Sequence, residues 1–191
     1  MWKWLAISSA VLAGSGAWAQ TPGSSPAGEA APKTTPQFAN KCVTAEYEEL
    51  DFLVGEWLVS DKASGKLQGL DVIQKDLEGC AIVGRWTQLN DDYKAHGERG
   101  RLKALNMFFV ARDGGAWRLA TQDSLGFSGF LTRIPTADGA ATFESEPFKR
   151  ATWRLSWKRM DDGTLESWGD FKPVGSSDWR RAYHNVGKAS G

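Results

Sequence analysis

Turn signals at short, regular intervals are the feature that most limits what this chain can fold into. Asp-Gly occurs at 113–114, 138–139 and 162–163, and this dipeptide favours the tight turns that join neighbouring antiparallel strands. The runs between the turns are rich in Trp, Phe, Val, Leu and Thr, which favour strands. Apolar and polar residues alternate through 153–158, as in a strand with one buried face. These features predict a succession of hairpins.

About ten strands follow from this pattern, and we expect the sheet that they form to close. Ten strands linked by hairpins would otherwise leave open edges, which attract further strands. The sequence therefore predicts an all-β fold, an antiparallel up-and-down β-barrel with a short helical turn near 44–53. The predicted strands are 56–62, 67–76, 80–89, 101–111, 116–124, 126–134, 140–148, 151–160, 164–172 and 179–186.

The first 19 residues have the parts of a secretory signal peptide. Lys3 is followed by an apolar run at 5–12 and a small-residue cleavage pattern at 17–19. A membrane span needs about 20 apolar residues, so we expect no stable span once the signal is removed. The next segment is rich in Pro, Ser, Gly and Ala and cannot bury enough surface to fold. The predicted order is signal peptide 1–19, disordered linker 20–40, β-barrel domain 41–187 and flexible tail 188–191, in a periplasmic or secreted protein.

Cys42 and Cys80 are the two cysteines of the chain. In an oxidising compartment an isolated pair is more often a disulfide than two free thiols. Closing this loop would stabilise the fold by about 3–4 kcal/mol in the chain-entropy model. The sequence has no Cys-x-x-Cys motif, so a redox or metal role is disfavoured.

The balance of charges and the small number of histidines argue against several classes of function. The 23 basic and 23 acidic residues balance, and there is no basic patch, which argues against a nucleic-acid partner. With His96 and His184 as the two histidines, a catalytic triad or a multi-histidine zinc site is hard to build. The acidic pairs at 91–92 and 161–162 are expected in solvated turns. We therefore predict no metal site and no catalytic residue, and we leave the oligomeric state open.

The segment 52–57, Phe-Leu-Val-Gly-Glu-Trp, resembles the opening of calycin-type barrels, the lipocalin-like class, whose first strand begins Gly-x-Trp. The chain also resembles a group of exported bacterial proteins that form a domain of unknown function, over roughly 42–186. The matching positions are Asp51, Phe52, Gly55, Glu56, Trp57, Gly79, Cys80, Trp86, Asn106, Phe108, Trp117, Asp123, Arg154, Trp157, Asp162, Gly163, Trp168 and Trp179.

The chain departs from that group at several positions. Leu53 replaces an aromatic residue, Val83 and Gly84 replace a polar pair, and Glu166 stands where an arginine is expected. The resemblance implies a barrel but carries no settled activity. It also implies a structural role for Gly55 and Trp57, with an arginine of the last strand, Arg181, covering the tryptophan through a cation–π contact of about 1 kcal/mol.

Aromatic and isolated polar residues recur at positions that can face a barrel interior, which predicts a lumen for a small apolar or aromatic ligand. Two alternatives stay open: an isomerase- or cyclase-type enzyme that polarises its substrate with one arginine and one amide, and a heme-binding barrel with His184 as iron ligand. A structural envelope protein is a third. The predicted ligand-binding residues are Trp86, Asn106, Phe108, Trp117, Gln122, Arg154, Trp157 and Trp168.

Overall fold

The computed structural model describes residues 42, 44–91, 101–111, 115–147 and 150–191. The predicted signal peptide and linker, as well as His96 and the second residue of the pair 91–92, lie outside them. None of the helices in the described residues has the length and hydropathy that a membrane crossing needs.

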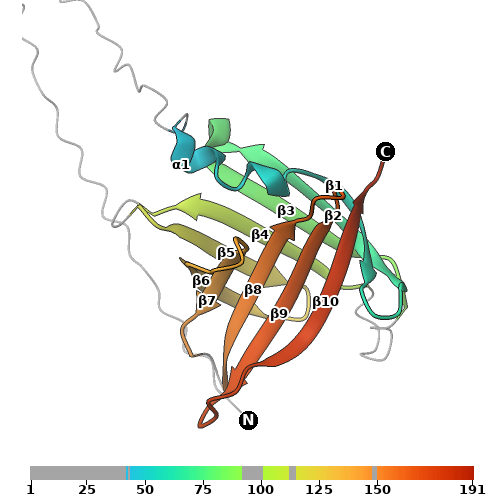
Figure 1. Cartoon of the computed structure of the whole chain (residues 1–191), viewed down its shortest axis with the longest axis vertical. Coiled ribbons are helices and arrows are strands. Elements are labelled where there is room, and N and C mark those ends of the chain that lie inside the picture. Colours follow the sequence, from blue (N-terminus) through green and yellow to red (C-terminus); the bar gives the residue numbers. More distant parts are fainter. Residues whose placement is uncertain (1–41, 43, 92–100, 112–114, 148–149) are drawn as a thin grey trace, which may run out of the picture. The chain divides into compact units, whose positions relative to one another are not determined.

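The described strands form one closed antiparallel barrel, which confirms the predicted fold (Figure 1). Each strand pairs with the next along the chain, and β10 pairs with β1 to close the sheet. The strands are β1 (Gly55–Asp61), β2 (Leu67–Asp76), β3 (Ala81–Gln88), β4 (Lys103–Val110), β5 (Trp117–Asp123), β6 (Ser128–Ile134), β7 (Ala141–Ser145), β8 (Ala151–Arg159), β9 (Leu165–Pro173) and β10 (Arg180–Ala189).

The predicted tail at 188–191 is wrong in its first half. Lys188 and Ala189 belong to β10 and pair with Leu58 and Trp57 across the seam of the barrel. The backbone N–H of Ser190 also donates a hydrogen bond to the carbonyl of Glu56, at 2.9 Å. These residues carry no strong strand signal, but barrel closure requires a partner for β1 along its whole length.

The segment before β1 closes one end of the barrel, where α1 (Ala45–Glu48) and η1 (Asp51–Leu53) form the predicted helical turn (Figure 1). Leu50 and Leu53 are fully buried against the apolar residues that point inward at this end. The indole of Trp57 donates a hydrogen bond to the carbonyl of Leu53 at 2.9 Å, and Trp117 donates one to that of Glu46 at 3.1 Å. Two tryptophans of the barrel wall thus hold this segment, residues 44–53, in place, and we call it the plug.

Ion pairs and a disulfide hold the same plug at its edge. Lys75 of β2 lies 2.7 Å from Asp51, and Arg133 of β6 lies 2.5 Å from Glu49. Each pair joins the plug to a different strand. Their exposed partners keep the single contributions at up to about 1 kcal/mol.

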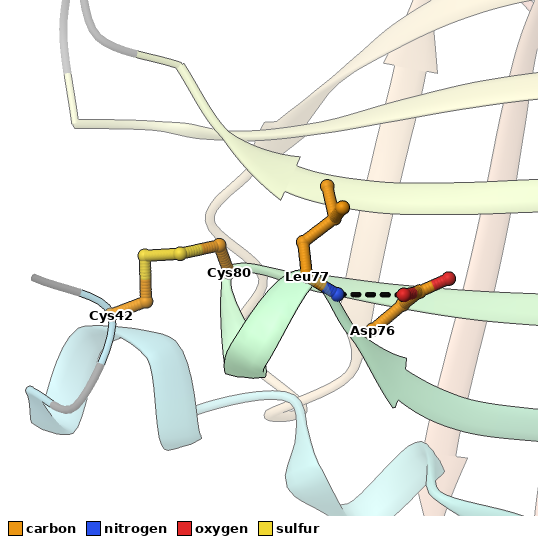
Figure 2. The surroundings of a disulfide bond; sticks show 4 residues. All are labelled: Cys42, Asp76, Leu77 and Cys80. Atoms are coloured by element: carbon orange, nitrogen blue, oxygen red, sulfur yellow. Dashed lines mark hydrogen bonds between the residues drawn. A yellow bond between two sulfur atoms is a disulfide. The ribbon is translucent and has the colours of Figure 1, made fainter. Parts of the chain in front are cut away.

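The disulfide joins Cys42, ahead of α1, to Cys80, directly before β3, with a Cα–Cα distance of 4.9 Å (Figure 2). This confirms the predicted pairing. Cys80 follows η2 (Leu77–Gly79), whose first residue donates its backbone N–H to the side chain of Asp76 at 2.7 Å. The covalent bond thus fixes the start of the plug to the β2–β3 turn.

Candidate ligand-binding lumen

A cavity of about 580 Å³ occupies the barrel interior between the plugged end and the opposite mouth. Its size falls within the range of small-molecule sites. The described residues that line it are Val59, Asp61, Gln68, Asp71, Trp86, Gln88, Leu102, Ala104, Asn106, Thr121, Asp123, Phe127, Trp153, Leu155, Trp157, Ser167, Ala182, Tyr183 and Asn185. A second hollow, of about 410 Å³, lies around Trp117 and Arg133 at the plugged end.

Five of the eight predicted ligand-binding residues point inward. Trp86, Asn106 and Trp157 line the cavity. Phe108 and Trp117 face the same interior but are 1% and 2% exposed, because they belong to the core beneath the cavity floor. Phe108 makes an edge contact with Trp157 at 5.3 Å between ring centroids, so the two layers are continuous.

The other three predicted ligand-binding residues lie on the outer face of the barrel, and the prediction that they face the lumen is wrong. Side chains alternate along a strand, so residues an odd number of positions apart face opposite ways. Arg154 is three residues from the inward Trp157, Gln122 lies between the inward Thr121 and Asp123, and Trp168 follows the inward Ser167.

The contacts of these outer residues agree with their placement. Arg154 pairs with Glu144 at 2.6 Å and lies over the ring of Trp179 at 3.9 Å. Gln122 is exposed and bonds a neighbouring backbone carbonyl. The enzyme alternative required an arginine and an amide in one pocket, and the barrel wall separates Arg154 from Asn106. That arrangement is therefore absent from the lumen.

His184 also lies on the outer face, between the lumen-lining Tyr183 and Asn185. Its Nε2 is 2.9 Å from Glu166, and its Nδ1 is 3.3 Å from Arg181. Burial works against the charge of Glu166, but hydrogen bonds from Lys62 and His184 outweigh it and lower the pKa of that carboxyl. Both ring nitrogens serve an outer polar network, so His184 is not placed to bind a heme inside the barrel.

The arginine over Trp57 is Arg159, and the predicted role of Arg181 is wrong. Trp57 pairs with Ala189, which places Arg181 eight residues away along β10, at the other end of the barrel. Arg181 pairs there with Asp170 at 2.5 Å. Arg159, at the end of β8, lies 4.6 Å from the centroid of the Trp57 ring and supplies the cation–π contact.

Glycines on neighbouring strands let two lumen aromatics lie along the wall. A Cβ placed on Gly69 would come within 2.5 Å of the Trp86 ring, and one placed on Gly169 would collide with the Tyr183 ring. Each ring therefore lies against the glycine backbone of the neighbouring strand. Sequence reasoning missed this pairing, and a glycine opposite or beside an aromatic on the next strand is the signal that could have shown it.

Asp71 is a half-buried carboxyl of the lumen with one oxygen shielded from solvent, and sequence reasoning missed it as well. It lies on β2, opposite Trp57 of β1 and Trp86 of β3. Its Oδ1 is inaccessible to solvent, and none of the described residues donates a hydrogen bond to it. Burial raises the pKa of Asp71 to about 6. A Cβ on Gly84 would lie 3.5 Å from that oxygen, so the missing side chain leaves room beside the carboxyl.

Two further carboxyls lie near the mouth, and each caps a turn. Asp61 accepts hydrogen bonds from the backbone and hydroxyl of Ser64 at 2.8 and 2.7 Å, and these bonds lower its pKa. Asp123 accepts from the backbone of Leu125 and Phe127 at 2.8 and 2.9 Å. Both carboxyls therefore have partners in the protein, unlike the inner oxygen of Asp71.

In the described part of the chain, no three His, Cys, Asp or Glu side chains are grouped so as to hold a metal ion. No protein-family model matches the chain, and no curated protein matches it.

Proposed function

We propose that this protein is an exported binding barrel that holds a small apolar or aromatic molecule in its lumen. The observation that carries the proposal is the cavity of about 580 Å³. Trp86, Trp153 and Trp157 supply broad apolar surfaces to it, and Asn106 and Asn185 supply isolated polar groups. Such a mixture fits a molecule with an aromatic body and one or two polar substituents.

The magnitude of burial supports a stable complex. A bicyclic aromatic compound that buries about 200 Å² of apolar surface would gain about 5 kcal/mol before the costs of ordering. Two features favour a lumen that is formed before the ligand arrives. The plug is cross-linked by the disulfide, and the aromatic rings rest on glycine backbone. Pre-organisation of this kind lowers the cost of binding.

Export is supported by the signal-peptide pattern of 1–19 and by the Cys42–Cys80 disulfide, which persists in oxidising compartments. We also propose kinship with the calycin-type barrels. The support is the Gly-x-Trp opening of β1, with Trp57 in the plugged end of a closed barrel.

Native mass spectrometry of the protein purified from its own host tests the binding function. We expect a co-purifying compound of a few hundred daltons, released on denaturation, whose return quenches tryptophan fluorescence. Ala104→Phe, which fills the lumen beside Trp86, should abolish its capture. Ala120→Phe is the matched control, because Ala120 lies on the outer face between Met107 and Phe130. Equal capture by both variants, or a host-derived protein that carries no compound, would refute the proposal.

A further inference from the structure

The lumen is acidic as well as aromatic. Asp71, Asp61 and Asp123 are the charged side chains among the described residues that line it, and that lining contains no lysine, arginine or histidine. Two basic groups at the plugged end are engaged elsewhere, since Arg159 covers the Trp57 ring and Lys75 pairs with Asp51. No basic side chain of the described lining therefore balances the negative charge inside the barrel.

Asp71 is the group that makes this imbalance informative. A buried charge is costly unless it is paired and hydrogen-bonded, and proteins retain such groups mainly where they serve a purpose. Its Oδ1 is buried, points toward Gly84 and has no hydrogen-bond donor among the described residues. No protein donor therefore offsets the charge on that oxygen, while Asp71 as a whole is half-buried and lines the cavity, where a ligand can reach its carboxyl.

Aromatic rings of the same cavity supply faces that attract positive charge. Trp86 lies directly across from Asp71 on β3, and Trp157 and Tyr183 line the same cavity. The faces of aromatic rings attract cations, most strongly where the site is shielded from water. An acceptor carboxylate among aromatic faces is the combination that recognises ammonium groups.

We infer that the ligand of the lumen is a small organic cation, a protonated amine or quaternary ammonium group on an aromatic or apolar body, whose charged group binds Asp71 between the aromatic rings. This inference rests on the proposed binding function. A metal ion fits poorly, because it prefers several oxygen ligands, and in the described residues no three His, Cys, Asp or Glu side chains are grouped to supply them. An anion would be repelled by all three carboxylates.

The titration of Asp71 gives the complex a distinctive pH dependence. The other titratable side chains of the described lining are Asp61 and Asp123, which cap turns at the mouth, and Tyr183. A permanently charged ligand needs the ionised carboxylate. Because burial raises the pKa of Asp71 to about 6, affinity for such a ligand should rise about tenfold between pH 5 and pH 8.

Three bicyclic probes of nearly equal shape test the inference by equilibrium dialysis: 1-methylquinolinium, its neutral isostere 1-methylnaphthalene, and the anion 1-naphthoate. At pH 8 the protein, freed of co-purified compounds, should bind the cation at least tenfold more tightly than the isostere, and the anion most weakly. Asp71→Asn should remove this preference and leave binding of the neutral probe within about twofold. Glu56→Gln, an equal change of charge on the outer face of β1, should keep it.

Three results would overturn the cation inference and leave the binding function intact. One is equal binding of cation and isostere by the unaltered protein. Another is a preference for the cation that survives in Asp71→Asn. The third is an affinity that falls from pH 5 to pH 8, since a protonated Asp71 would then donate a hydrogen bond to a neutral ligand. If no probe binds and no host compound is carried, both the inference and the proposed function fail.

Discussion

Replacing Asp71 with asparagine should stabilise the ligand-free protein at neutral pH. The ordinary pKa of the carboxyl is 3.8, and burial raises it to about 6 in the folded protein. The folded state therefore holds the proton more tightly than the unfolded state does. The contribution of the neutral Asp71 carboxyl to the free energy of unfolding is fully present below about pH 4. It is lost as the pH rises through about 6 and the carboxyl ionises.

The size of the effect follows from the shift. Each unit of pKa is worth about 1.4 kcal/mol, so a shift of about two units costs the folded protein about 3 kcal/mol above pH 7. Asparagine keeps the shape and polarity of the protonated acid but carries no charge. We expect the free energy of unfolding of Asp71→Asn to be about 3 kcal/mol higher at pH 8, with a melting temperature about 6–12 °C higher. At pH 4 the two proteins should be equally stable.

Urea denaturation followed by tryptophan fluorescence, from pH 4 to pH 8 and after removal of any bound compound, measures this difference. Carboxyls whose pKa is lowered, such as Asp138 and Asp162, act in the opposite direction, and their stabilisation disappears as the pH falls. They are common to both proteins and cancel in the comparison. Glu56→Gln should change stability by less than about 0.5 kcal/mol.

Two results would refute the reasoning about Asp71. One is an equal stability of Asp71→Asn and the unaltered protein at pH 8. The other is a difference that persists unchanged down to pH 4. The first result would show that the carboxyl is hydrated or paired, and the second would show that the difference in stability does not come from its charge.

Two further predictions concern the plugged end. Replacing both Cys42 and Cys80 with serine should lower the free energy of unfolding by about 3–4 kcal/mol, measured by urea denaturation, with the barrel signature in circular dichroism retained; a loss below 1 kcal/mol would show that the ion pairs and tryptophan bonds hold the plug unaided. Arg159→Ala should cost about 1 kcal/mol and shift the emission of Trp57 as its ring becomes exposed, whereas Arg181→Ala should leave that emission unchanged. A shift of Trp57 emission in Arg181→Ala but not in Arg159→Ala would show that Arg181, and not Arg159, lies over Trp57.

The order of strands and the hairpins between them could be predicted from the sequence, because both depend on local interactions. An Asp-Gly pair favours its turn through the conformations of a few consecutive residues. Strand β8 likewise shows its inner face directly, since Trp153, Leu155 and Trp157 alternate with polar residues. That alternation already places Arg154 outside, so its assignment to the binding site went against a pattern visible in the sequence. The disulfide also followed from the presence of only two cysteines.

The inner face of β2 was decided by the closed sheet. Leu70 and Val72 are apolar but point outward, while Asp71 shares the inner face with Gly69 and Ile73. The alternation of apolar and polar residues along β2 would predict that Asp71 faces solvent. This pattern relates a residue only to its neighbours in the chain. Which face is buried depends on the register with β1 and β3.

The same reason separates Arg159 from Arg181. Which arginine reaches Trp57 depends on the register at the β1–β10 seam and on where β8 ends, and these are set only when the first and last strands meet. Local residues therefore determined the strands and turns of this protein. Closure of the barrel determined which side chains share its interior, because burial and charge pairing there depend on all ten strands together.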